Sequence, residues 1–233
     1  MEDEQKLNLL RLAINNASDF EEAKAYASFI MGDRSPIATC APRADEGDGR
    51  TKAVKGGGVY IVTKGLPPVP FGAVGVVHNP EKFDVMVRYH GHEWIVEKHD
   101  VSENEISLLK PGANVIVNSP FYKSEIEALV NFDMESCTDH LRKSGLYFKL
   151  DDDLYIPTVG QLAAMYLWRE ELNKALEMVG GAPMKESRYW SSNEIRPVNI
   201  WLVTFDAGCA FSWGGSSGQA FVRPCRTIEL KKK

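Results

Sequence analysis

The chain has 233 residues, of which 44% are hydrophobic and 25% are charged, as in an ordinary soluble globular protein. That length suits one large domain or two small ones and is enough to bury a substantial core. The formal net charge of −5 argues against nucleic acid as a partner, because a phosphate-binding face needs an excess of Lys and Arg.

The first residues carry no recognisable targeting signal. Residues 1–5 are acidic where a signal peptide would be basic, and no apolar h-region follows them. No apolar run approaches the roughly 20 residues needed to cross a bilayer. We therefore expect synthesis in the cytoplasm and no membrane insertion.

Two short amphipathic helices are predicted over residues 6–16 and 20–31, where apolar residues recur at near-helical spacing. Residues 33–58 are rich in Pro, Gly, Asp and Arg and lack periodicity, which predicts a loop or linker. We therefore expect an N-terminal helical region with its linker over residues 1–57 and a second domain over residues 58–233. The helices could assemble the chain into a homo-oligomer, or they could pack on their own domain.

The rest of the chain changes from short strands to helices and back to strands. β-Type composition between turn residues predicts strands over 59–62, 73–77, 85–89 and 93–96. Apolar spacing predicts helices over 122–130, 136–143 and 158–178, the last broken or turned near Arg169. Because strands and helices occupy separate stretches, the predicted fold class is α+β.

One cluster contains residue types that bind metals: His90, His92, Glu93, Glu97 and His99. On a strand His90 and His92 would share a face, but Gly91 between them favours a tight turn, and no third ligand can be named. The run Asp151–Asp153 has neither the interleaved oxygen ligands nor the turn glycine of a calcium loop. We therefore expect no metal and no cofactor.

The cysteines and serines form no catalytic pattern. Cys40, Cys137, Cys209 and Cys225 lack metal-type spacing, so free thiols are the simplest interpretation, although Cys209 could pair with Cys225. Ser191-Ser192 has no G-x-S-x-G context and no neighbouring His. The sequence therefore predicts a protein that is not an enzyme.

The segment from Asn199 to Val222 contains one formal charge and is otherwise rich in Ser, Gly and aromatic residues. Alternation predicts that one set of side chains faces the core: Trp201, Val203 and Phe205. The opposite set is chemically mixed and is expected to face outward: Leu202, Thr204 and Asp206. After a turn at Ala207-Gly208, Phe211 and Trp213 precede a Gly- and Ser-rich loop. Exposed aromatic rings there would mark an interaction site; the alternative is that both rings belong to the core.

Short motifs follow one another over roughly residues 130–226: Phe132–Asp139, Tyr155–Leu162 (similar to LPTxxEL), Leu172–Leu176 with Gly180-Gly181 (similar to INAAL…GG), Tyr189–Ser192, Trp201-x-Val203-x-Phe205-x-x-Gly208 and Val222-Arg223-Pro224. In order and spacing they resemble the C-type-lectin-fold variable proteins of diversity-generating retroelements, with their non-diversified relatives in gut bacteria and phages.

The resemblance implies a C-type-lectin-like fold whose terminal segment, about residues 189–222, is rewritten at adenines of its coding DNA. Fixed residues would support the fold, and the rewritten ones would form a hypervariable ligand-binding surface. By position, the ligand-binding residues would be Asn193, Ile195, Arg196, Val198, Asn199, Leu202, Thr204, Asp206, Ala207, Cys209, Phe211, Ser212, Trp213, Gly214, Gly215, Ser216, Ser217 and Gln219. Such a chain would be a phage or bacterial adhesin, carried on a virion in the phage case, that binds a protein or glycan ligand on a target cell surface.

Two other functions stay open. One is a structural protein of a virion or other particle, with a lectin-like fold and no diversified site. The other, less favoured, is a metal enzyme or a cysteine enzyme of the formylglycine-generating type, whose close cysteine pair is not matched by Cys209 and Cys225. The calcium-ligand motifs of sugar-binding animal lectins, Glu-Pro-Asn and Trp-Asn-Asp, are absent, so calcium-dependent sugar binding is not implied.

Overall fold

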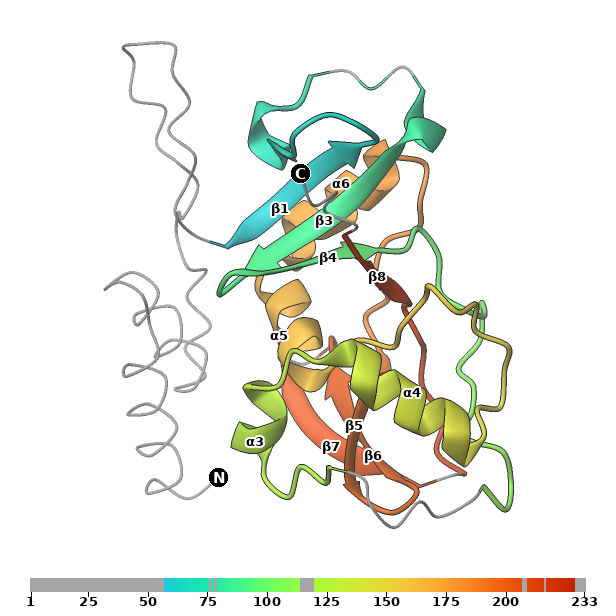
Figure 1. Ribbon diagram of the computed structural model, residues 1–233. Helices are drawn as coiled ribbons and strands as arrows, with labels where there is room; N and C mark the ends of the chain where they lie inside the picture. The colour runs from blue at the N-terminus through green and yellow to red at the C-terminus, as the bar shows by residue number, and fades with distance from the viewer. Residues whose placement is uncertain are drawn as a thin grey trace. The chain divides into compact units, whose positions relative to one another are not determined.

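The computed structural model describes residues 57–75, 77, 79–113, 120–206, 209–215 and 217–228 (Figure 1). The chain divides into one unit over residues 1–57 and another over residues 58–233, and the fold described below is that of the second unit. The predicted N-terminal helices, the linker and Cys40 lie outside the described residues.

The second unit combines helices with antiparallel sheets, so the predicted α+β class is confirmed. One sheet contains β1 (Gly58–Thr63), β2 (Val69–Pro70), β3 (Phe83–Tyr89), β4 (His92–Val96) and β8 (Cys225–Thr227). The other sheet contains β5 (Arg188–Arg196), β6 (Asn199–Thr204) and β7 (Ala210–Gly214). The helices are α3 (Glu125–Leu129), α4 (Met134–Ser144), α5 (Val159–Leu167) and α6 (Arg169–Met178), and two 3-10 turns, η1 (Phe71–Ala73) and η2 (Pro80–Lys82), lie between β2 and β3.

The five-stranded sheet brings together the beginning and the end of this unit. Its strand order is β2-β1-β3-β4-β8, and the neighbouring strands are antiparallel. Strand β8 pairs with β4 through Ile95 and Arg226. A strand from the C-terminal part of the chain therefore completes a sheet whose other strands come from residues 58–96 (Figure 1).

The strand predictions in this region are mostly confirmed as β1, β3 and β4, but the strand predicted over 73–77 is wrong. Ala73 ends the 3-10 turn η1, and the segment that pairs with β1 on this side is Val69-Pro70. Gly72 and Gly75 interrupt the apolar run, which shows that β-type composition without a pairing strand is insufficient. The tight turn predicted at Gly91 is confirmed, since Gly91 has φ 77°.

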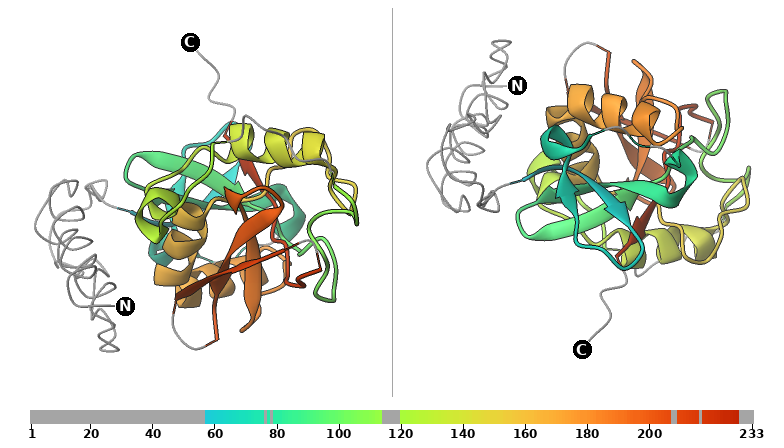
Figure 2. Two further views of the ribbon diagram at one scale, coloured as in Figure 1. Left: turned by 90° about the horizontal axis from the view of Figure 1, so that it is seen from below. Right: turned by 90° about the horizontal axis from the view of Figure 1, so that it is seen from above.

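The helix predicted over 158–178 is confirmed together with its break, because α5 ends at Leu167 and α6 begins at Arg169. Thr158 and Gln161 form a capping box that fixes the start of α5. The helix predicted over 122–130 is shorter, as α3, and the one over 136–143 is longer, as α4. Helix α6 packs on β1 and β3, whereas α5 contacts both sheets (Figure 2).

A buried ion pair between Arg223 and Asp100 holds together chain segments that lie outside the strands of the two sheets. Arg223 Nε donates to Asp100 Oδ1 at 2.7 Å, and the two side chains are 0% and 5% exposed. The other donors of this guanidinium reach backbone carbonyl oxygens of Glu97, Lys98, Ala182 and Pro183. Burial raises the pKa of Asp100, and the positive charge of Arg223 opposes that shift. Arg223 thus ties the segment after β4 to the segment that leads into β5.

Candidate ligand-binding surface

Strand β6 is the central strand of the three-stranded sheet, and both of its faces are covered. Trp201, Val203 and Phe205 are buried in one hydrophobic cluster, as alternation predicts. Leu202 is buried in a second cluster on the opposite face, beside Trp190. The expectation that Leu202 faces outward is therefore wrong, because alternation separates core from solvent only where one face of a sheet is open.

Asn193 is also buried, at 0% exposure, contrary to its expected place on the binding surface. Its Oδ1 accepts a hydrogen bond from the backbone N–H of Val159 at 2.7 Å, in the first turn of α5. Its Nδ2 donates to Cys137 Sγ at 3.8 Å, in α4. The side chain therefore joins β5 to two helices, and it is part of the support rather than of the surface.

Gly214 is constrained by the indole of Trp190. A Cβ at Gly214 would lie 2.8 Å from that ring, and one at Gly218 would lie 3.0 Å from it. The ring is itself fixed, since Trp190 Nε1 donates to the carbonyl oxygen of Ile106 at 2.8 Å. Because Gly214 and Gly218 have no side chain, the end of β7 and its loop can pass over Trp190. Any residue with a Cβ at position 214 is not compatible with this packing.

We expect Gly214→Ala to lower the free energy of unfolding by about 1–3 kcal/mol, because the added methyl group overpacks a fixed ring. Gly215→Ala is the matched control: a Cβ there meets only Asn199 Oδ1 at 3.7 Å, an ordinary contact. The control is expected to stay within about 0.5 kcal/mol of the wild type. Chemical denaturation of the three proteins measures both effects, and equal losses would contradict the packing described for Gly214.

Most of the other predicted binding residues are exposed or partly buried: Ile195, Arg196, Val198, Asn199, Thr204, Asp206, Cys209, Phe211, Ser212, Trp213, Gly215, Ser217 and Gln219. Ala207 and Ser216 lie outside the described residues. The exposed set is concentrated on β7, which is the edge strand of its sheet, and on the β5–β6 turn.

Trp213 and Arg196 form the most distinctive feature of this surface. Trp213 pairs across the strands with buried Trp201, yet its own side chain is 50% exposed. The guanidinium carbon of Arg196 lies 4.8 Å from the centroid of the Trp213 ring, which is a cation–π contact. Phe211, on the same face, is half-buried and packs against the core. Of the two aromatic residues, Trp213 is therefore the one available to a ligand.

Two residues that sequence reasoning missed, Glu194 and His140, fix the turn that follows Arg196. Glu194 Oε1 accepts from the backbone N–H of Val198 at 3.2 Å, and Val198 has the left-handed φ of 55°. Glu194 Oε2 lies 3.0 Å from His140 Nε2, within ion-pairing distance, and Glu194 is 4% exposed. The one acidic residue of β5, next to the buried stretch Tyr189–Asn193, was the available signal for this role. Because His140 lies in α4, this helix supports the β5–β6 turn.

The three described cysteines, Cys137, Cys209 and Cys225, are free thiols, so the possible Cys209–Cys225 pair does not form. Cys137 lies in a polar cluster, 3.5 Å from the hydroxyl oxygen of Tyr122, whose oxygen also accepts a hydrogen bond from Asn131 Nδ2. Burial raises the pKa of the Cys137 thiol to about 11. This thiol is therefore protonated at neutral pH and is not an activated nucleophile.

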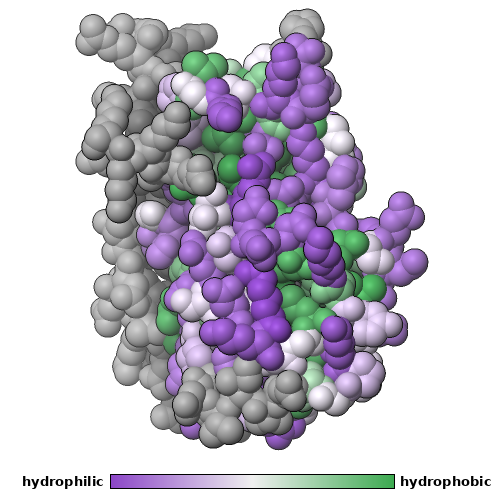
Figure 3. Space-filling view, turned by 45° about the vertical axis from the view of Figure 1, so that its right-hand side comes forward, coloured by the Kyte–Doolittle hydropathy of each residue, from purple (hydrophilic) through white to green (hydrophobic). Residues whose placement is uncertain are grey.

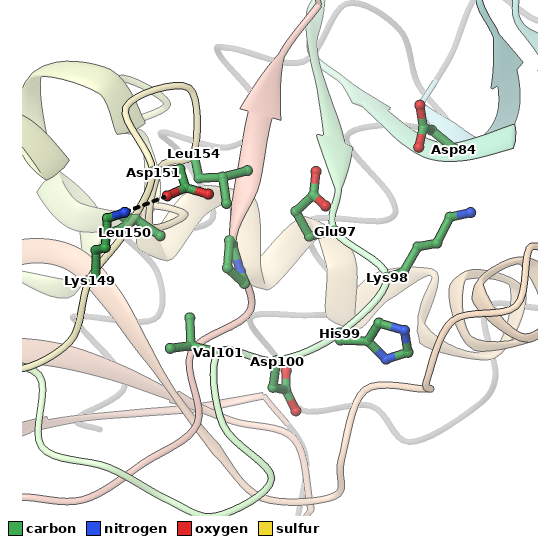
Figure 4. A pocket seen from close by; sticks show the side chains of 11 residues that line it. Asp84, Glu97, Lys98, His99, Asp100, Val101, Lys149, Leu150, Asp151 and Leu154 are labelled. Atoms are coloured by element: carbon green, nitrogen blue, oxygen red, sulfur yellow. Dashed lines mark ion pairs between the residues drawn. The ribbon is translucent and has the colours of Figure 1, made fainter. Parts of the chain in front are cut away.

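A separate open cavity of about 430 Å³ is lined by residues 97–101 and 149–151 together with Asp84, Leu154 and Pro224 (Figure 4). Its charges are engaged within the protein: Arg226 bridges Asp84 and Glu97, and Asp100 holds Arg223. Figure 4 also shows Lys149 facing Asp151, 3.8 Å apart. We assign this cavity no ligand, because its carboxylates already neutralise neighbouring side chains.

Neither a metal centre nor a membrane span emerges from the described residues. Within them, no group of three or more His, Cys, Asp and Glu side chains is placed to hold a metal ion. Likewise, no helix in that part of the chain is long and apolar enough to cross a bilayer. On the face shown in Figure 3, hydrophilic side chains cover most of the area and hydrophobic ones form smaller groups between them.

Comparison of the chain with protein-family models, with curated proteins and with solved structures found no match. The functional conclusion therefore depends on the arrangement of the residues described above.

Proposed function

We propose that this chain is a non-enzymatic ligand- or receptor-binding protein with a C-type-lectin-like fold, related to the variable proteins of diversity-generating retroelements. The observation that carries the proposal is the pair formed by Trp213 and Arg196, a half-exposed ring and a cation on a sheet whose remaining aromatic residues are buried or, as for Phe211, partly buried. An α+β unit with antiparallel sheets is compatible with the proposed fold.

The buried layer under the surface gives this binding function its physical basis. Trp190 and Leu202 pack in one buried cluster, Asn193 joins β5 to α4 and α5, and Glu194 with His140 holds the β5–β6 turn. Residues supported in this way can present exposed side chains in a fixed geometry, which is what a recognition site requires. Aromatic and Arg side chains of this kind often dominate the energy of an interface. A phage or bacterial adhesin that recognises a target cell surface is the function that fits best.

The first test is to sequence the DNA that flanks the gene. We expect a near-repeat of the codons for residues 189–226 beside a reverse-transcriptase gene, with mismatches at adenines of the repeat. The surface described above sharpens this expectation: mismatches should fall in codons of exposed residues such as Arg196 and Ser212, and spare those of Asn193, Leu202 and Gly214.

The absence of such a repeat would remove diversification from the proposal. Mismatches in the codons of the buried residues would contradict the division between support and surface. Without a repeat, a static particle protein would stand equal to a binding protein, whereas misplaced mismatches would leave diversification in place and overturn only the assignment of surface residues.

A further inference from the structure

Building on the proposed function, we propose that the Arg196–Trp213 pair recognises a carboxylate-bearing polysaccharide on the target cell. Arg196 would bind the carboxylate, and the Trp213 ring would stack on a sugar ring beside it. This names the chemical class of the ligand, which the proposed function leaves open between protein and glycan.

Arg196 has the properties of an anion-binding residue. It is exposed, its described interaction is the contact with the Trp213 ring, and no described carboxylate forms an ion pair with it. A guanidinium presents a planar fork of donors that matches the two oxygens of a carboxylate, and stacking on an aromatic ring leaves its N–H edges available. A carboxylate arriving at this side chain therefore does not have to displace a competing acidic group.

Within residues 189–222, no described carboxylate forms an ion pair with Arg196. Residues 189–222 carry only three formal charges, on Glu194, Arg196 and Asp206. Glu194 is buried against His140. Trp201 is the cross-strand neighbour of Trp213, and Asp206 lies five residues along the chain from Trp201. At the rise of a strand this separation is about 16 Å. It exceeds the Debye length in physiological salt, so the charge of Asp206 is largely screened. Within this segment, Arg196 is therefore an exposed cation without an ion-pair partner, although the chain as a whole is acidic.

The apolar part of the surface is small, which favours a sugar over a protein partner. Trp213 is the only large hydrophobic residue of segment 189–222 that is exposed among those described. A stable protein interface buries about 800 Å² on each partner around several anchors, and a single ring does not supply them. The C–H face of one sugar ring matches one indole face, and the exposed side chains of Ser217 and Gln219 offer hydroxyl and amide groups nearby in the chain.

The test is calorimetric titration of the full chain with polygalacturonate, alginate, hyaluronan and polysialic acid, each beside its methyl ester. The ester keeps the sugar rings and removes the carboxylate charge. We expect binding to at least one acidic polymer, no binding to its ester, and weaker binding at higher salt. Arg196→Gln and Trp213→Ala should each weaken binding at least about tenfold, the loss expected when one charge-assisted or stacking contact is removed.

Arg188→Gln is the matched control, because Arg188 is an exposed arginine of the same strand that already pairs with Glu105. It changes the net charge equally and should leave affinity unchanged. Failure to bind any acidic polymer, equal binding to acid and ester, or stronger binding to poly-L-glutamate would each overturn the proposed ligand class. The proposed function is tested separately by the flanking DNA, so a template repeat found beside a failed titration would overturn the ligand class alone.

Discussion

Replacing Arg223 with methionine is expected to lower the free energy of unfolding by about 3–5 kcal/mol at neutral pH. The substitution removes the cation that neutralises Asp100 and leaves backbone carbonyl oxygens from two segments without their donor. A carboxylate that is 5% exposed then has to stay ionised without a partner or take up a proton. Urea or guanidinium denaturation at neutral pH measures the loss.

Arg226→Met provides the matched control for Arg223→Met. Arg226 also pairs with two carboxylates, Asp84 and Glu97, but it is 33% exposed, so its loss is expected to cost about 1 kcal/mol or less. Equal losses in the two variants would contradict the special role of Arg223.

The stability deficit of Arg223→Met should also depend on pH, in a direction set by Asp100. Burial already raises the pKa of Asp100 in the folded protein, and losing Arg223 removes the charge that opposes this shift. A carboxyl group whose pKa is higher in the folded than in the unfolded state lowers the free energy of unfolding at neutral pH, where it is ionised. This loss of stability disappears as the pH falls and the group is protonated. We therefore expect the deficit to shrink between about pH 7 and pH 4, whereas a deficit that grows on acidification would refute this explanation.

Leu202→Asp is expected to lower the free energy of unfolding by at least about 4 kcal/mol, or to prevent folding. Leu202 is 4% exposed and packs in the cluster that contains Trp190, so the new carboxylate would enter an apolar layer. Ser212→Asp is the control, because Ser212 is the cross-strand neighbour of Leu202 but is exposed. It should change stability by about 0.5 kcal/mol or less.

Thermal melts of the two Asp variants give the comparison directly. A Leu202→Asp protein that melts near the wild-type temperature would show that this face of β6 is open to solvent. It would also return Leu202 to the binding surface, from which its burial now removes it.

Much of the architecture can be predicted from local pattern. The break between α5 and α6, the strands β1, β3 and β4, and the core positions Trp201, Val203 and Phe205 all follow from periodicity and turn residues. These signals succeed because each depends on residues close together in the chain. The run over 73–77 shows the limit, since a strand also needs a partner that composition does not reveal.

The candidate surface was harder to predict, because it depends on what covers each face of β6. Alternation predicts that Leu202 faces outward and the family resemblance predicts a surface position for Asn193, yet tertiary contacts with Trp190, Val159 and Cys137 bury them. The Arg196–Trp213 contact joins the last residue of β5 to β7, on the other side of β6, and no spacing rule connects them. Pattern alone therefore indicates the right segment, but only the sheet order separates its exposed residues from its supporting ones.

The pairing of β8 with β4 has a consequence for how the protein is made. The five-stranded sheet, which begins at residue 58, cannot be completed until its last strand, Cys225–Thr227, has left the ribosome. Any stop codon or frameshift between residues 189 and 222 removes that strand together with Arg223. If this segment of the gene is rewritten, truncated products would lack β8 and Arg223 and would remain unfolded. Only variants with an intact reading frame would then yield folded protein.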